Sequence, residues 1–122
     1  MNFKSPNQRA EFWQLHPKLR LILCDIDNWL QYQFNEEIIV TDLIRSEEQQ
    51  KQLYDAGMAP AVTSVHQFGR GADLRVFKSL DANHTVLQWV NEKYPYDLDR
   101  EHLKTMIRHG GTALHYHLQC LT

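Results

Sequence analysis

Two short stretches of this sequence carry side chains that can bind a metal. The first, TSVHQFGRGADLR, holds His66 and Asp73, and the second, LHYHLQ, holds His115 and His117. If LHYHLQ forms a strand, His115 and His117 point to one face and Tyr116 to the other. Two imidazoles and one carboxylate form a ligand set suited to zinc, with a fourth position left for water. Such a water becomes a nucleophile near neutral pH, so this set predicts metal-assisted hydrolysis.

Each of these residues also has an ordinary structural interpretation. A histidine in a loop is usually a polar surface residue, and Asp73 could begin a strand or pair with Arg70 or Arg75. An H-x-H pair could be a solvated strand face, in a domain that binds no metal. The combination of residues, more than any single one, favours a metal site. Gly69 and Gly71 would allow the backbone to leave one ligand and return along a strand with the other.

Caps and hydrophobic periodicity predict the elements that position these residues. Apolar residues recur three and four apart from Leu19 to Phe34, which predicts one face of a long helix. Ser46, with Gln49 three residues on and Gly57 behind, predicts a capped helix. The full set comprises helices in segments 5–15 (with Ser5 as N-cap and Pro6 at the first helical position), 17–34, 46–57 and 81–95, strands in 36–44 and 72–77, and a hairpin in 104–121, with a loop over 58–71. This order indicates an α+β fold, with helices packed on a small, mostly antiparallel sheet.

Length and composition restrict the class of protein. A chain of 122 residues is expected to form one domain, residues 1–122, with a core of its own. The formal net charge of −2 and the pI near 6.4 give no reason to expect nucleic acid as a partner. Charged residues interrupt the longest apolar run, LRLILCDIDNWL, so no membrane span is expected. The start, MNFKSPNQRAEFW, lacks the apolar region of a signal peptide, which predicts cytoplasmic synthesis without that export route.

The stretch SVHQFGRGAD resembles the S-x-H-x-x-G-x-A-x-D signature of the zinc D-Ala-D-Ala carboxypeptidase superfamily. That group includes phage L-alanyl-D-glutamate endolysins, the vancomycin-resistance dipeptidases and the hedgehog signalling domain. Ser64, His66, Gly69 and Asp73 match the signature, and Gly71 stands in place of its alanine. The resemblance covers residues 37 to 120 and implies a single zinc peptidase-like domain with the small α+β fold of that group.

The resemblance implies both a ligand set and an activity. His66 and Asp73 would bind zinc, and His117 would complete the set as the second histidine of an H-x-H ending like that of the carboxypeptidase and hedgehog branches. We therefore expect a zinc metallopeptidase that hydrolyses the D-Ala-D-Ala or L-Ala-D-Glu bond of peptidoglycan stem or cross-link peptides. A phage or prophage origin, with the enzyme released to the cell wall or carried in a virion, is implied as well. The alternative is an inactive zinc-bearing binding or structural module on the same fold.

Upstream of the signature, the segment VTDLIRS resembles the family strand that ends in a tyrosine–arginine pair, with Ile44 in place of the tyrosine. By this resemblance Arg45 would bind substrate and stabilise the developing oxyanion. The planar donor fork of arginine suits both tasks. The structural alternative is a salt bridge from Arg45 to Glu47 or Glu48 at the start of the next helix.

The expected catalytic base is missing from its usual place. In the family it is an acidic residue a few positions before the last zinc histidine, and residues 108–116 contain no carboxylate. Histidine titrates in the range needed to accept that proton, so His115 and His109 are candidates. His115 would also donate a hydrogen bond to the tetrahedral intermediate. A carboxylate from Asp97, Asp99 or Glu101 is a further alternative.

The hairpin turn decides which histidine faces the zinc. A two-residue turn at Gly110–Gly111 would pair His109 with Thr112 and turn His109 away from the zinc face. A three-residue turn would pair it with Ala113 and turn it toward that face. The Gly-Gly pair favours the short turn, and therefore His115 as the base.

Overall fold

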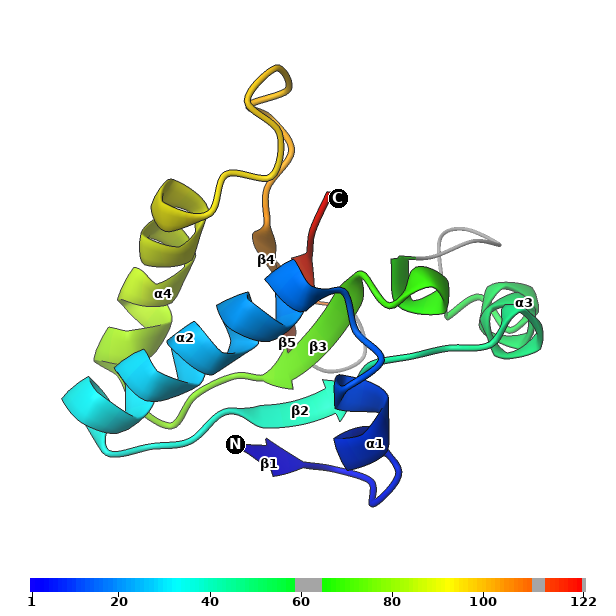
Figure 1. Cartoon of the computed structure of the whole chain (residues 1–122), viewed down its shortest axis with the longest axis horizontal. Coiled ribbons are helices and arrows are strands. Elements are labelled where there is room, and N and C mark those ends of the chain that lie inside the picture. The colour runs from blue at the N-terminus through cyan, green and yellow to red at the C-terminus, as the bar shows by residue number, and fades with distance from the viewer. Residues whose placement is uncertain (59–64, 111–113, 122) are drawn as a thin grey trace.

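The computed structural model describes residues 1–58, 65–110 and 114–121. In chain order its elements are β1 (Asn2–Phe3), α1 (Gln8–Phe12), α2 (Pro17–Phe34), β2 (Ile39–Asp42), α3 (Glu47–Asp55), the 3-10 helix η1 (Val65–Phe68), β3 (Gly71–Arg75), α4 (Leu80–Lys93), β4 (Met106–His109) and β5 (His115–Gln119). The sheet has the order β1-β2-β3-β5-β4, with β1 and β2 parallel and all other neighbours antiparallel. The predicted α+β class and mostly antiparallel sheet are therefore confirmed (Figure 1). In these three ranges no helix combines the length and apolar character needed to cross a membrane.

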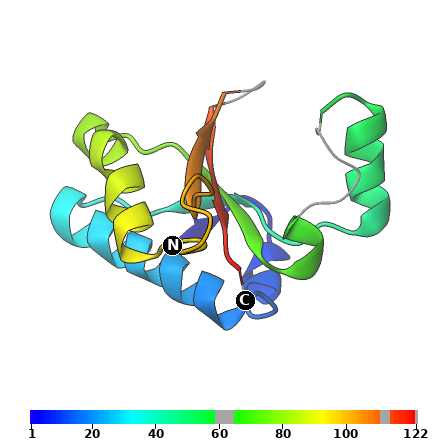
Figure 2. The same ribbon diagram turned by 90° about the horizontal axis from the view of Figure 1, so that it is seen from above.

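Helices α2 and α4 lie together on one side of the sheet, where they bury the core (Figure 2). The predicted apolar stripe of α2 is buried from Leu19 to Leu30. Four side chains of β3 and β5 enter the same core with no exposed surface: Ala72, Leu74, Tyr116 and Leu118. Because side chains alternate along a strand, Asp73, His115 and His117 point to the opposite face of the sheet.

Helix α3 follows its predicted cap signals. Ser46 Oγ accepts from the backbone N–H of Gln49 at 3.0 Å, and the Gln49 side chain accepts from the Ser46 N–H at 2.9 Å. Gly57, with φ of 72°, follows the helix in the left-handed conformation that glycine favours. Helix α3 lies on the other side of the sheet from α2 and α4 (Figure 2). By strand alternation, Asp73 and His117 belong to the face opposite the core.

The N-terminal segment differs from its prediction. Helix α1 begins at Gln8 with Asn7 as N-cap, so the assignment of Ser5 and Pro6 to these positions is wrong. The side chain of Gln8 still makes one bond that a Ser5 cap would have, because it accepts from the Ser5 N–H at 3.1 Å, and it also donates to the Thr41 carbonyl at 3.0 Å. These bonds tie the turn before α1 to β2. The two-residue strand β1 was not predicted, since two residues are too few to show a period.

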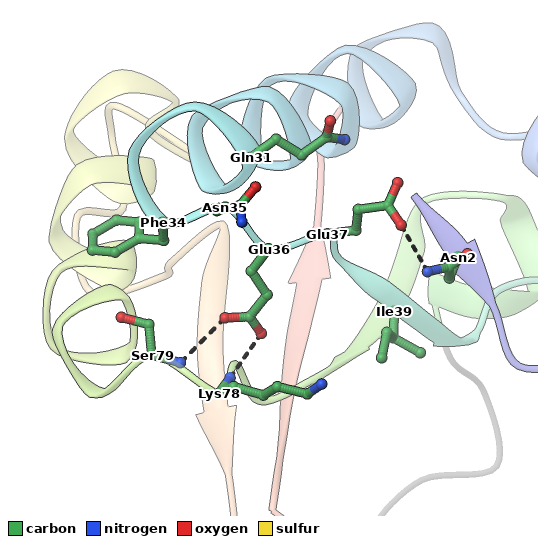
Figure 3. Close-up of a pocket in the computed structure, with 9 residues that line it drawn as sticks. All are labelled: Asn2, Gln31, Phe34, Asn35, Glu36, Glu37, Ile39, Lys78 and Ser79. Atoms are coloured by element: carbon green, nitrogen blue, oxygen red, sulfur yellow. Dashed lines mark hydrogen bonds between the residues drawn. The ribbon is translucent and has the colours of Figure 1, made fainter.

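Glu36 connects the end of α2 to the start of α4. Its carboxylate accepts from the backbone N–H groups of Lys78 at 2.7 Å and Ser79 at 3.1 Å, where the dipole of α4 favours a negative charge (Figure 3). Beside it, Glu37 accepts from the Asn2 side chain at 2.9 Å. These residues line a hollow of about 750 Å³. None of the predicted metal ligands lines it, so it belongs to the junction between α2, β1 and α4.

The β4–β5 hairpin is present, but both predicted registers are wrong. His109 pairs directly with His115, Ile107 with His117 and Met106 with Leu118. Residues 110–114 therefore connect the strands, and Thr112 and Ala113, the predicted partners of His109, lie outside the described residues. Met106 and Leu118 are both buried in the core. Their burial determines the register of the hairpin, because a shift by one residue would turn one of them to the other face. This register turns His109 to the same face as His115.

Candidate metal centre

Three elements bring His66, Asp73 and His117 together, as predicted from the sequence. His66 comes from η1, Asp73 from β3 and His117 from β5, and Asp73 and His117 are cross-strand partners. Oδ1 of Asp73 lies 3.3 Å from Nε2 of His66 and 2.9 Å from Nδ1 of His117. One ligand atom from each residue lies within 4.8 Å of the other two. His66 is 2% exposed and Asp73 9%, whereas His117 is only partly buried, so water reaches the cluster from the His117 side.

The backbone immediately after β2 orients the ring of His66. Nδ1 of His66 lies 2.6 Å from the carbonyl oxygen of Leu43. A carbonyl only accepts, so Nδ1 carries the proton and donates it. The nitrogen that faces Asp73, Nε2, then presents a lone pair. This arrangement is the one a metal-binding histidine needs, with its second nitrogen held by a hydrogen bond.

Two consecutive hydrogen bonds orient His117 so that it, like His66, presents a lone pair to Asp73. The amide nitrogen of Gln119 donates to the carbonyl of Lys104 at 2.9 Å, which fixes the direction of the amide. Its oxygen, Oε1, therefore faces Nε2 of His117, 3.3 Å away. Nε2 must donate to this oxygen, and Nδ1 presents its lone pair to Asp73.

Two imidazole lone pairs and a carboxylate oxygen thus converge on one place. Neutral rings in these tautomers would repel the Asp73 carboxylate, because no proton lies between the acceptors. A cation resolves the conflict, either as an added proton on each ring or as a metal ion shared by the three atoms. Burial raises the pKa of Asp73, but hydrogen bonds from His117 and His66, which require a proton on the facing nitrogen of each ring, outweigh it and hold that pKa well below its usual range. The donor set, two imidazoles and an ionised carboxylate, fits zinc.

Close packing of η1 on β3 holds His66 in place. Gly71 does not have a positive φ, so the predicted backbone freedom applies to Gly69 (φ 67°) and not to Gly71. A Cβ at position 71 would lie 2.6 Å from Cγ2 of Val65 and 3.1 Å from the backbone nitrogen of His66. Glycine is required there because η1 crosses β3 without room for a side chain. The alanine of the superfamily signature does not fit this packing.

Gly71→Ala is expected to weaken metal binding through this contact. The added methyl group pushes η1, and His66 with it, away from Asp73. We expect a loss of about 1–3 kcal/mol in the free energy of unfolding, as for other overpacked cores, and lower zinc affinity. Gly110→Ala is the matched control, because a Cβ there meets nothing within 4 Å. Chelator competition and urea denaturation measure both effects, and wild-type zinc affinity in Gly71→Ala would show that the contact is unimportant.

Gln119 is a functional residue that the sequence did not reveal. Its role depends on the carbonyl of Lys104, which only the fold places beside it. Replacing Gln119 by leucine removes the acceptor of His117 Nε2–H, and the loss of a hydrogen bond that orients a metal-binding histidine costs about 10–100-fold in metal affinity. Gln88→Leu, on the exposed side of α4, is the control. A competition titration with a chromophoric chelator measures the affinity, and equal values for the two variants would contradict this role of Gln119.

Arg45 lies beside the cluster, but its partners differ from those considered. Its guanidinium donates twice to Oδ2 of Asp42, by Nε at 3.1 Å and by Nη2, and once to Oε1 of Gln50 at 2.6 Å. Nη2 also lies 3.9 Å from Oδ2 of Asp73. Within the described ranges its ion pairs are with Asp42 and Asp73, so the alternative of a pair with Glu47 or Glu48 is wrong. Asp42, the cross-strand neighbour of Asp73, was not considered from the sequence.

His115 and His109 flank the cluster on the same face. Nε2 of His115 lies 4.0 Å from Oδ2 of Asp73. The ring of His109 lies 5.4 Å from that of His115 and 5.6 Å from that of His117, between centroids. Burial, together with His117 and His115 nearby, lowers the pKa of His109. The sequence held an indication that His109 faces the cluster. Apolar Met106 should share the core face with Tyr116 and Leu118, and only a connection with an odd number of residues between the two strands permits this.

The carboxylates of the loop before β4 lie elsewhere. Asp97 accepts from Nε of Arg100 at 2.7 Å and from the backbone N–H of Asp99 at 2.9 Å. Asp97 and Leu98 line a hollow together with Lys18 and Leu121, beyond the end of β5. In the described ranges, no contact joins Asp97, Asp99 or Glu101 to the cluster of His66, Asp73 and His117.

Comparisons with known proteins leave the family open. No protein-family model matches the chain, and neither the curated proteins nor the solved structures give a significant match.

Proposed function

We propose that this protein is a zinc-dependent peptidase in which His66, Asp73 and His117 hold the metal. The observation that supports it is the convergence of Nε2 of His66, Nδ1 of His117 and Oδ1 of Asp73, with the rings oriented by the Leu43 carbonyl and by Gln119. Three protein ligands with a fourth position open are typical of catalytic zinc, whereas structural zinc has four.

The residues around the cluster would divide the remaining tasks. Bound zinc would supply Lewis acidity toward a peptide carbonyl and toward water. His115, with Nε2 near Asp73 and its side chain 32% exposed, would donate to the carbonyl oxygen as negative charge develops there. His109, at the outer side of His115, would accept a proton at a ring nitrogen and pass it to the leaving amine.

The substrate class rests on the resemblance of SVHQFGRGAD and LHYHLQ to the D-Ala-D-Ala carboxypeptidase superfamily. We propose peptidoglycan stem peptides, cut at a D-Ala-D-Ala or L-Ala-D-Glu bond, and a phage or prophage origin with action at the cell wall. The metal geometry and the substrate class are independent parts of the proposal, so each needs its own test.

One observation favours the second candidate function, an inactive zinc-bearing binding module. Arg45, the residue expected to bind substrate, already satisfies its guanidinium with Asp42 and Gln50. Asp42 is the cross-strand partner of Asp73, and its carboxylate is bound by Arg45. A module of this kind would bind the stem peptide without cutting it.

Digestion of purified peptidoglycan separates the two functions. Zinc-loaded protein is incubated with peptidoglycan, and the soluble fragments are identified by mass spectrometry. We expect fragments from cleavage within the stem peptide, and we expect His115→Ala to keep its zinc while losing most of this activity. His84→Ala, an exposed histidine of α4, is the control. Zinc-loaded protein that co-sediments with peptidoglycan but releases no fragment would replace the enzyme by the binding module.

A further inference from the structure

A second pair of histidines lies beside the triad and has no role in holding its metal. His109 of β4 and His115 of β5 are direct cross-strand partners, and both point to the face of Asp73. Their ring centroids are 5.4 Å apart with an angle of 34° between the planes. His109 is exposed and the His115 side chain is 32% exposed, so a dissolved ion can reach both rings.

The spacing of this pair matches that of the triad. The rings of His66 and His117, which would share the first metal, have centroids 5.3 Å apart. Two imidazoles bound to one tetrahedral ion, each with a nitrogen about 2.1 Å from it, have centroids about 5 Å apart. His109 and His115 are therefore spaced so that small ring rotations bring one nitrogen from each to a common ion.

Asp73 offers each pair of histidines a different oxygen. Its Oδ1 faces His66 and His117, at 3.3 Å and 2.9 Å. Its Oδ2 lies 4.0 Å from Nε2 of His115 and 3.9 Å from Nη2 of Arg45. A carboxylate placed in this way can bridge two ions, one on each oxygen. The second site would have two nitrogens and one oxygen shared with Arg45, so it would bind metal more weakly than the triad.

We propose that His109 and His115, with Oδ2 of Asp73, form a second and weaker site for a divalent transition metal such as zinc. It fills only after the triad is occupied. If the peptidase function holds, a second ion inhibits the enzyme, because it occupies the two histidines that would donate to the substrate and move the proton. The inhibition rests on the proposed function, whereas the metal site rests on the geometry alone.

Equilibrium dialysis against increasing free zinc tests the site without any substrate. We expect the wild-type protein to take up one equivalent and then a second, and His109→Gln to take up one only. His102→Gln, which changes an exposed histidine in the loop before β4, should keep both. In ¹⁵N-histidine NMR spectra the second equivalent should shift the ring nitrogens of His109 and His115 and leave those of His84 unchanged.

Three results would overturn the second site: saturation of the wild type at one equivalent, two equivalents in His109→Gln, or a second equivalent that leaves the His109 and His115 signals unmoved. The peptidase assay then separates the two proposals. Inhibition of the wild-type enzyme over the zinc range in which dialysis shows the second equivalent to bind supports both, whereas two-equivalent binding without hydrolysis supports the site and contradicts the enzyme.

Discussion

Asp73→Asn protein is expected to bind no zinc at the triad. The amide has no negative charge to offer the ion, and its NH₂ group donates to the lone pairs on Nε2 of His66 and Nδ1 of His117, which lie 3.3 Å and 2.9 Å from Oδ1 in the wild type. These bonds take the place of those by which His117 and His66 hold the pKa of Asp73 low in the wild type. We therefore expect metal-free Asp73→Asn to stay folded.

Metal analysis and thermal unfolding with and without chelator check this prediction. Zinc at 100 times its dissociation constant should add about 2.7 kcal/mol to the unfolding free energy of the wild type and nothing through the triad of Asp73→Asn. His115→Gln is the control, because it changes a neighbour of Asp73 and leaves the three ligands in place. One tightly bound equivalent of zinc in Asp73→Asn would refute the ligand assignment.

Arg45→Ala is expected to lower stability first and activity only as a consequence. The Arg45 side chain is 15% exposed, and its guanidinium contacts two carboxylates, those of Asp42 and Asp73, which are paired across β2 and β3. Removal of one partner from a buried ion pair costs about 3–5 kcal/mol. The Asp42 side chain is 34% exposed, and water compensates part of the loss, so we expect about 2 kcal/mol.

Urea denaturation of metal-free and zinc-loaded protein measures this loss. Arg45→Lys keeps the positive charge but not the planar fork that reaches Asp42 and Gln50, so its stability should lie between those of the wild type and Arg45→Ala. Unchanged unfolding together with lost binding of stem peptide would instead support the substrate-binding role that the resemblance to the superfamily predicts.

Local signals in the sequence were sufficient for much of the fold. The cap residues Ser46 and Gln49 form the predicted capping box, and the apolar stripe from Leu19 to Leu30 is buried as its period indicates. The predicted cap at Ser5 is wrong, since α1 begins at Gln8, whose side chain bonds both the Ser5 N–H and a distant carbonyl in β2. A cap depends on a few adjacent residues, so it is predictable only where no distant partner competes for them.

The sequence by itself also determined which residues could bind a metal, because ligand chemistry follows from residue type and strand alternation places His115 and His117 on one face. The tertiary structure decided how these residues are used. Burial of Met106 and Leu118 set the register that brings His109 to the site, and the carbonyls of Leu43 and Lys104 fix the tautomers of His66 and, through Gln119, of His117. The contacts of the two carbonyls join residues far apart in the chain. No local pattern encodes these two contacts, since each depends on which strands the buried core brings together.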